Sequence, residues 1–313
     1  MEQESFFQYL PINQENIRWG LYLTGVGFCR VEPNSPYPPK GHPDVYDFNW
    51  AAGRVLPEYQ ILLIAEGSGL FESSPTGSVP LTAGSILFLF PGLWHRYRPN
   101  PHTGWKEYWL SWNGENLYRL QQQGLLSPDK AVLTTQSPDT ILRAFERILD
   151  QVRTHPAENS SVLSAYAMEV LTLAVQNEQK PVARGTEKAV VPCPDYALDD
   201  PVVFNALQLI WNHSYRDFQV KDIVQKLPMT RRTLERRFRR CLNHSIGDEI
   251  IRCRIERAKH LLINTTLPIK HIALAVGCTS ADRLAKAFRQ DTQQTPTQFR
   301  RHHRPAASPS GKA

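Results

Sequence analysis

The chain has 313 residues, enough for two domains, and its hydrophobic content of 41% is typical of a globular protein without a membrane-spanning apolar run of roughly 20 residues. Its five cysteines are scattered and never spaced Cys-x-x-Cys, which argues against a disulfide framework or a zinc site and for a reducing cytoplasm. Lys and Arg outnumber Asp and Glu by 21 to 10 from Leu198 onward but are outnumbered 15 to 20 before it, a charge asymmetry typical of nucleic-acid binding.

Residues 1–60 are rich in proline, glycine and aromatic residues. The acidic N-terminus lacks a secretory pattern. Because proline at this density excludes long helices, we expect a folded arm and short edge strands here.

Residues 59–112 show the pattern of an all-β domain. Residues 60–65 read as a buried strand, 66–69 as a turn, 70–72 as a further strand and 73–77 as a second turn. Three more strands follow at 85–90, 93–98 and 105–112, separated by Gly/Pro turns. This spacing predicts a sandwich or a small barrel.

Residues 138–178 predict two helices separated by Pro156. Each has an apolar stripe: Ile141, Leu142, Phe145, Ile148, Leu149 and Val152 in the first; Val162, Leu163, Tyr166, Val170 and Val175 in the second. The stripes fit helices that cover the barrel and equally a dimer interface. Residues 180–197 are polar and read as a linker, Pro201 opens the next helix, and residues 304–313 read as a disordered tail.

Two similar units follow in tandem. In the first, helix 220–227 and helix 231–238 flank a break at 228–230; in the second, helix 269–276 and helix 280–288 flank a break at 277–279. The second helix of each unit has an apolar i, i+4 pair, Leu234 with Phe238 and Leu284 with Phe288. Such a helix–turn–helix unit lays its second helix in the major groove of DNA.

The exposed face predicted for helix 231–238 and its continuation is basic. It presents one acid, Glu235, among five arginines: Arg231, Arg232, Arg236, Arg239 and Arg240. A solvated helix that binds nothing is the simpler interpretation, but the second unit of the same design favours DNA binding.

These motifs carry a family resemblance. Residues 230–238, 254–262, 267–269, 272–273 and 295–300 resemble the DNA-binding domain of the AraC/XylS family of transcriptional regulators. Asn243 and Gln294 stand where that family usually has glycine at helix-end turns. The order Gly84, Pro91-Gly92, His95-x-Tyr97, then Trp105 and Trp109, resembles the cupin-type sensor domain of sugar-responsive members.

The fold class expected is α+β multidomain, with a cupin-like β-barrel carrying two helices and an all-α domain of two helix–turn–helix units joined by a linker helix. The domain boundaries expected are 1–179 for the effector-binding and dimerisation domain, 180–197 for the linker, 198–303 for the DNA-binding domain and 304–313 for the tail.

In the first recognition helix we expect Thr230 to cap the N-terminus, and Arg232 and Arg236 to present forks to guanine. Glu235 is either an acceptor for cytosine N4 or a salt-bridge partner of Arg231 or Arg239. The DNA-binding residues predicted are Thr230, Arg231, Arg232, Thr233, Glu235, Arg236 and Arg240 in the first unit and Ser280, Ala281, Asp282, Arg283 and Lys286 in the second. The shorter, less basic second set predicts more backbone positioning and fewer base contacts.

The barrel segment supplies flat indole faces suited to a sugar ring. The resemblance implies that Tyr97, Glu107 and Trp109 line the effector pocket, with Arg54 before the first barrel strand and His95 near the mouth. Core packing is the alternative for each tryptophan, whereas a buried Glu107 requires a partner such as a ligand hydroxyl or Arg54.

No His-x-His pair of the kind that cupin enzymes use for a metal precedes His95. His42, His95 and His102 could converge on folding, but we expect no metal site. No catalytic arrangement with supporting context is found, so we expect neither a cofactor nor an enzyme. The function predicted is a cytoplasmic, sequence-specific transcription regulator, more an activator than a repressor, that binds double-stranded promoter DNA and a sugar effector. It is expected to form a homodimer and not to associate with membranes. A contact with RNA polymerase is compatible with this function. A constitutive regulator with a structural barrel, or a metal-dependent cupin enzyme fused to a DNA-binding domain, are the alternatives.

Overall fold

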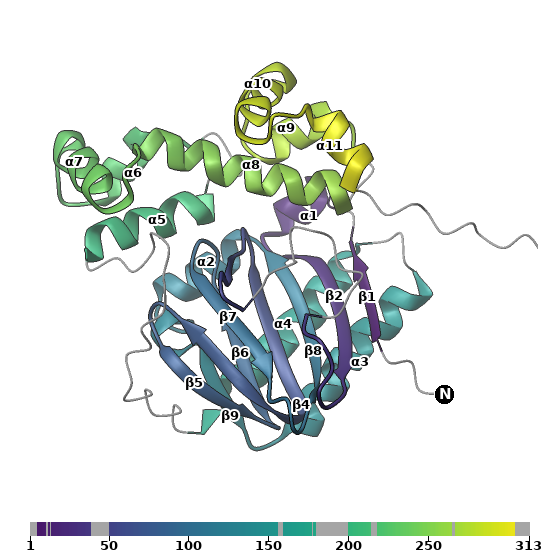
Figure 1. Cartoon of the computed structure of the whole chain (residues 1–313). Helices are drawn as coiled ribbons and strands as arrows, with labels where there is room; N and C mark the ends of the chain where they lie inside the picture. Colours follow the sequence, from purple (N-terminus) through teal and green to yellow (C-terminus); the bar gives the residue numbers. More distant parts are fainter. Residues whose placement is uncertain are drawn as a thin grey trace, which may run out of the picture. The chain divides into compact units, whose positions relative to one another are not determined.

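The computed structural model divides into two compact units, one built mainly from residues before 198 and one from Leu198 onward (Figure 1). The structure describes residues 5–10, 12, 14–38, 50–155, 159–176, 178–179, 200–213, 218–264 and 267–303. The expected linker, the expected tail and His42 lie outside the described residues. Each unit is described by itself.

The described part of the first unit forms a ten-stranded sheet whose pairings are antiparallel. Its main path is β1-β2-β8-β4-β6-β9-β10, with β3, β5 and β7 branching from it. The strands are β1 Ser5–Tyr9, β2 Tyr22–Val31, β3 Arg54–Val55, β4 Tyr59–Ser73, β5 Gly77–Thr82, β6 Ser85–Leu89, β7 Trp94–Pro99, β8 Trp105–Asn113, β9 Val132–Thr135 and β10 Glu178–Gln179.

Strand β4 is the longest and makes the sheet bend. Its first half pairs with β6 and β8, and its second half with β5 and β7. A register shift between Ile64 and Glu66 marks the bend, and Gly67 there has a φ of +82°. A Cβ on Gly67 would lie 2.2 Å from the carbonyl oxygen of Gly104, so only glycine fits. The turn predicted at 66–69 is therefore wrong: the glycines mark a bulge within one continuous strand.

The expectation for residues 1–60 is wrong in part. Strand β2 is ten residues long and lies between β1 and β8 with its side chains buried, so it is a central strand and not a short edge strand. The prolines that suggested irregular structure follow β2, and they do not interrupt it. Two short helices were not predicted, α1 Gln14–Trp19 and α2 Glu115–Gln122, nor was the 3₁₀ turn Pro128–Lys130.

Helices α3 Pro138–Thr154 and α4 Ser161–Gln176 pack against the sheet, α3 on β2, β4 and β8 and α4 on β2 (Figure 1). The predicted stripe of α3 is largely buried. The predicted stripe of α4 is wrong in part, because Val162 is 47% exposed and the buried face comprises Leu163, Ser164, Ala167, Val170, Leu171 and Ala174. This nearly all-apolar helix offers several possible faces, so tertiary packing selects one.

The described part of the second unit is helical. Its helices are α5 Pro201–His213, α6 Val220–Lys226, α7 Arg231–Leu242, α8 Ile246–Asn264, α9 Ile269–Ala275, α10 Ala281–Thr292 and α11 Pro296–His303. Each predicted helix–turn–helix unit is present, as α6–α7 and α9–α10, with α8 between them (Figure 1). Leu234, Phe238, Leu284 and Phe288 are all fully buried, as the i, i+4 spacing predicted.

Candidate nucleic-acid interface and effector pocket

The helices α7 and α10 are built alike, fifty residues apart. Thr230 Oγ1 accepts a hydrogen bond from the Thr233 amide (3.3 Å), and Ser280 Oγ accepts one from the Arg283 amide (3.2 Å). Both residues are therefore N-caps, as expected for Thr230. Each helix ends on a left-handed residue, Asn243 (φ 58°) or Gln293 (φ 59°). The glycine-like turn of the second unit thus falls on Gln293, one residue before the predicted Gln294, because the helices have equal length.

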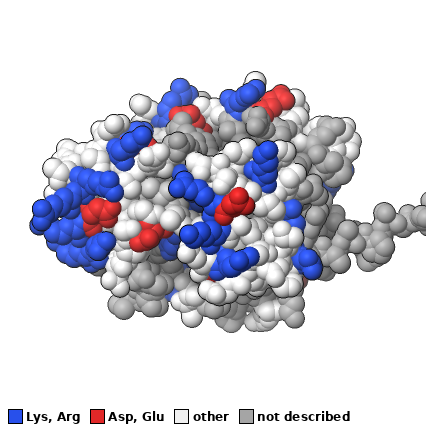
Figure 2. Space-filling model, turned by 90° about the horizontal axis from the view of Figure 1, so that it is seen from above, with Lys and Arg blue, Asp and Glu red and all other residues white. Residues whose placement is uncertain are grey.

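The outward face of α7 is strongly basic. Arg232, Arg236 and Arg240 follow one another at i, i+4 and i+8 opposite the buried seam, and all three are exposed, as are Arg231 and Arg239. Figure 2 shows Lys and Arg side chains gathered at the left of the view, the side on which Figure 1 draws α7. This stripe can approach a phosphate-lined groove and present guanidinium forks to base edges.

The outward face of α10 is mixed in charge. Asp282, Lys286 and Gln290 occupy the positions that Arg232, Arg236 and Arg240 occupy in α7, and all three are exposed. Arg283 is also exposed, and its Nη1 donates to Thr279 Oγ1 (3.3 Å), whereas Ala281 is half-buried. The second helix therefore has less positive charge to offer DNA than the first.

Glu235 has a contact that the sequence did not suggest. Its Oε2 accepts from the backbone amide of Ile246, the first residue of α8, at 3.4 Å. The corresponding positions of the second helix–turn–helix unit are Ala285, whose side chain has no hydrogen-bond acceptor, and Pro296, which has no amide hydrogen. The first helix–turn–helix unit has both the Glu235 carboxylate and the Ile246 amide, and the second has neither group. This indicates that Glu235 supports the start of α8.

In the compact unit from Leu198 onward, α8 contacts the elements that carry both recognition helices. Glu249 is fully buried and accepts from Trp211 Nε1 (2.7 Å) and Arg252 Nε (3.1 Å), while His244 Nε2 lies 2.8 Å from it. The hydrogen bond to Glu249 raises the pKa of His244. At the other end, Lys259 of α8 contacts Asp291 of α10 (3.0 Å). Nineteen residues at about 1.5 Å each make α8 a strut of about 28 Å.

The candidate effector pocket lies within the first unit. Trp105, Glu107 and Trp109 alternate on β8, so their side chains share one face of that strand, and all three are buried. Arg54 of β3 pairs in register with His95 of β7.

Four of the five predicted pocket residues are connected. Arg54 Nη2 donates to the Tyr97 hydroxyl (2.6 Å) and its Nε to His95 Nε2 (3.4 Å). His95 Nδ1 lies 3.0 Å from the Leu93 carbonyl oxygen, which can only accept, so the proton is on Nδ1. Tyr37 is hydrogen-bonded to both Tyr97 and Glu107, which links Glu107 to Arg54.

This network is held in unusual protonation states. Burial raises the pKa of Glu107 to about 8, against the lowering effects of Arg54 and of the hydrogen bond with Tyr37. Burial and the positive charge of Arg54 lower the pKa of His95 to about 3. Both side chains are therefore uncharged at neutral pH. Among the described residues, Glu107 Oε2 and Trp105 Nε1 are buried without a hydrogen-bond partner, which is costly unless a further polar group meets them.

Trp109, the fifth residue, packs against β2. A Cβ on Gly27 would lie 2.8 Å from its indole ring, and the ring of Tyr9 lies 6.1 Å away. Three residues near this network were not predicted from the sequence: Tyr9, Tyr37 and Glu58. Glu58 Oε2 accepts a hydrogen bond from Thr24 Oγ1 (2.5 Å). Tyr9 and Tyr37 stand in a stretch interpreted as an arm, so only the tertiary structure brings them to this network.

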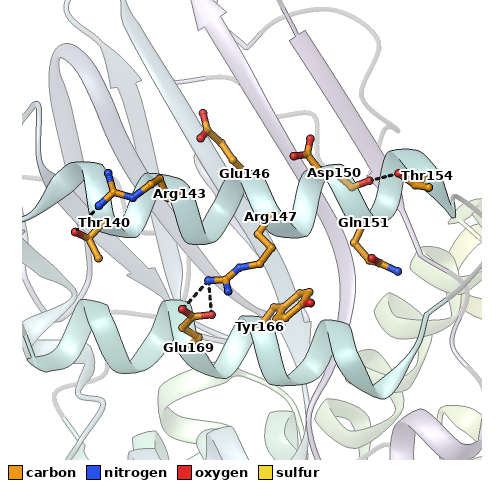
Figure 3. A pocket seen from close by; sticks show the side chains of 9 residues that line it. All are labelled: Thr140, Arg143, Glu146, Arg147, Asp150, Gln151, Thr154, Tyr166 and Glu169. Carbon is orange, nitrogen blue, oxygen red and sulfur yellow. Dashed lines mark hydrogen bonds and ion pairs between the residues drawn. The ribbon is translucent and has the colours of Figure 1, made fainter.

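The outer faces of α3 and α4 enclose a shallow groove of about 700 Å³ (Figure 3). Arg147 of α3 bonds both carboxylate oxygens of Glu169 on α4 (2.6 Å) and lies over the Tyr166 ring. Charges of both signs line the groove: Arg143, Glu146, Arg147, Asp150 and Glu169. It is an exposed polar surface on helices whose other face covers the sheet.

Within the described ranges, no group of three or more His, Cys, Asp or Glu side chains has the arrangement of a metal site. None of the described helices is both long enough and apolar enough to cross a membrane.

Comparison with known proteins gives two family matches. The family described as "AraC-like ligand binding domain" matches residues 46–174, and the family described as "Helix-turn-helix domain" matches residues 223–302.

The chain is similar to several individual proteins over different shares of its length. The xylose operon regulatory protein of Escherichia coli K12 is 32% identical over 107 residues, which is 34% of this chain and 27% of that protein. The Msm operon regulatory protein of Streptococcus mutans is 24% identical over 247 residues, 79% of this chain and 85% of that protein. The solved structure of ToxT from Vibrio cholerae covers 96% of this chain and 99% of its own, at 11% identity and a TM-score of 0.40. The chain thus spans about a quarter of the length of the xylose regulator that it matches.

The chain thus combines a strand-rich domain that matches the AraC-like ligand-binding family with a helical domain that contains two helix–turn–helix units. Together the two matches identify the chain as a member of the AraC family.

Proposed function

We propose that this protein is a sequence-specific, double-stranded promoter-DNA-binding regulator that responds to a sugar bound in its first unit. The observation that carries the DNA half is the arginine stripe of α7 on a capped helix with a fully buried seam. The name of one relative, the xylose operon regulatory protein, supports a sugar as the effector.

In the DNA complex, Arg232 and Arg236 are the base readers of the first unit, with Arg231 and Thr233 beside them and Thr230 as the cap. Glu235 can still accept a hydrogen bond from cytosine N4 through its other oxygen, Oε1, since a carboxylate offers about four acceptor positions. The second unit acts through Arg283 and Lys286 on the DNA backbone, with Ser280, Ala281 and Asp282 at the start of α10 closest to the groove.

In the first unit, Arg54, His95, Tyr97, Glu107 and Trp109 form the effector site. The Glu107 carboxyl at Oε2 and the Trp105 Nε1–H, both without a hydrogen-bond partner among the described residues, are available to hydrogen-bond ligand hydroxyl groups. A neutral carboxyl, a neutral imidazole and one guanidinium suit an uncharged polyol better than a dianion. No cofactor and no catalytic step are part of this function.

The active form is a homodimer in the cytoplasm, where its promoter DNA is accessible. The outer groove of α3 and α4 presents both charge signs, which permits contact with a second copy in antiparallel order. Contact with RNA polymerase is part of the proposed activator role.

The test is a thermal-shift screen of the full chain against pentoses, hexoses, uronates and polyols, because a bound ligand stabilises by mass action. The hit is then added at saturation while affinity for a selected promoter fragment is measured. A changed DNA affinity, and the reciprocal change in effector affinity, are expected. Arg54→Ala should abolish the shift but leave DNA affinity without effector in place.

A constitutive regulator with a structural barrel is the second candidate, favoured by the packing of Trp109 against Gly27 and Tyr9. It predicts that no sugar shifts the melting temperature or changes DNA affinity, while sequence preference persists.

A further inference from the structure

Asp200 occupies a junction between two helices of the second unit. Its side chain is only 8% exposed and precedes α5. Oδ1 accepts from the amides of Val202 (3.1 Å) and Val203 (3.4 Å), which makes Asp200 the N-cap of α5. An aspartate directly before Pro201 is a helix-start signal that the sequence already contained.

The same carboxylate contacts the recognition helix α7. Arg237 Nη1 donates to Oδ1 at 3.1 Å, and Arg240 Nη2 donates to Oδ2 at 3.3 Å. Arg237 and Arg240 are three residues apart, so both reach the same flank of α7. One buried acid therefore joins the start of α5 to the C-terminal half of the recognition helix.

The two arginines differ in how much of each side chain is exposed. Arg240 has 72% of its side chain exposed, and Arg237 has 37% exposed. An exposed ion pair contributes little by itself. The buried carboxylate, in contrast, would be costly without its cationic partners.

The second helix–turn–helix unit has no such arrangement. The residues that correspond to Arg237 and Arg240 are Ala287 and Gln290. We call the contacts of Asp200 with Arg237 and Arg240 the clamp. The clamp is on the more basic of the two recognition helices, where excess positive charge would bind any DNA sequence.

We infer that Asp200 is a positioning residue for DNA recognition: it aligns α7 on α5 and withholds Arg237 and Arg240 from the DNA backbone. Base reading then rests on Arg232 and Arg236, and binding to unrelated DNA stays weak. Arg240, predicted from sequence as a DNA contact, becomes part of the clamp. This inference rests on the proposed DNA-binding function.

The test uses the full chain and a random-sequence duplex, with affinity measured by fluorescence anisotropy between 50 and 200 mM salt. Asp200→Asn keeps the helix cap, because asparagine caps as well as aspartate, but removes the charge. Its affinity for the random duplex should rise several-fold, and the slope of log affinity against log salt should steepen by about 0.9 for each arginine released. Adding Arg240→Gln to this variant should remove most of the gain.

Asp222→Asn is the matched control, since Asp222 also bonds a backbone amide at a helix start, that of Gln219 (2.8 Å), and loses the same charge. Its salt slope should change less. Asp200→Ala, which loses cap and charge, should in addition lower the melting temperature, whereas Asp200→Asn should not; a cap without a clamp would predict no effect of Asp200→Asn on the slope.

Unchanged random-duplex affinity and slope in Asp200→Asn would overturn the clamp. So would a loss of affinity in the single variant Arg240→Gln as large as that in Arg236→Gln, because Arg240 would then already engage DNA. Failure of the broader function is distinguishable: the wild-type protein would show no preference for any selected duplex over the random one.

Discussion

Arg236 lies at the centre of the exposed arginine stripe of α7, one turn from Arg232 and opposite the seam of Leu234 and Phe238. Its position on the helix could be predicted from the sequence, because the buried pair sets the phase. Which arginines are available to DNA could not, since the partner of Arg237 and Arg240 comes from outside the helix.

We expect Arg236→Ala to lower specific DNA affinity by about 1–3 kcal/mol and to relax preference at one base pair. A guanidinium fork that reads guanine makes both contributions at once. Binding to a panel of single-base operator variants measures the change. Equal weakening on all sequences would reduce Arg236 to a phosphate contact.

Lys286→Ala in α10 is the contrasting change. A phosphate contact from lysine should be lost evenly across sequences, and the salt slope should flatten by about 0.9. The same operator panel at several salt concentrations tests this. An altered base preference would contradict the role assigned to Lys286.

Glu107 gives a pH prediction for the first unit. Its pKa of about 8 lies above the ordinary value of 4.5, so the folded protein retains a proton that the unfolded chain releases. The stability contributed by this proton is present at acid pH and lost as pH rises through about 8, with a limiting slope of about 1.4 kcal/mol per pH unit.

Glu107→Gln should remove this dependence. The difference in unfolding free energy between wild type and the variant, measured by urea titration from pH 5 to 9, should move in favour of the variant as pH rises. Taking the difference cancels the other titrating groups. A difference that stays constant over this range would show that Glu107 is ionised in the folded protein.

At the scale of elements, α7 and α10 have the same length, the same kind of N-cap and the same left-handed C-terminal turn. The Thr230 cap and both buried seams were predicted from the sequence, because each depends on local spacing, whereas both helices run four residues beyond the predicted Phe238 and Phe288. The left-handed turn after α10 lies at Gln293, one residue before the predicted Gln294, since no glycine marks the position.

That position gives a stability prediction. Gln293→Gly should stabilise the protein by roughly 0.5–1 kcal/mol, because a left-handed conformation strains a residue with a side chain. Asn243→Gly should gain less, since asparagine tolerates this conformation. Gln294→Gly is the control and should gain nothing. Urea unfolding of the full chain measures all three, and a gain in Gln294→Gly alone would move the turn back to the predicted residue.

The strands, in contrast to the helices, were predicted poorly from local sequence patterns. Residues 59–73 contain two glycines that resemble a turn, yet they form one bulged strand, because β4 must serve two sets of partners. Strand β2 escaped prediction because its buried run follows a short helix and precedes a proline-rich stretch. Sheet partners lie far apart in the chain, and local patterns do not identify them.

At the scale of the whole molecule, α8 sets how the second unit meets DNA. A strut of about 28 Å separates the two recognition helices by a distance close to one turn of the double helix, about 34 Å. Contacts at both ends of α8, through Glu249 and Lys259, hold that separation.

We expect one protein chain to read two successive major-groove segments at this fixed spacing. Inserting five base pairs between the two segments turns the second onto the opposite face of the duplex, so specific affinity should fall at least about tenfold. The same insertion outside the site is the control. Affinity that tolerates the internal insertion would mean that only one recognition helix engages the operator.

The sequence by itself determined the class of protein: a basic tandem of helix–turn–helix units after a strand-rich domain, because charge balance, apolar period and caps are local properties. Only the tertiary structure decided which side chains cooperate. Tyr37 joins Glu107 to Arg54, and Asp200 binds the arginines of α7, because folding brings together residues tens of positions apart in environments that no local pattern encodes.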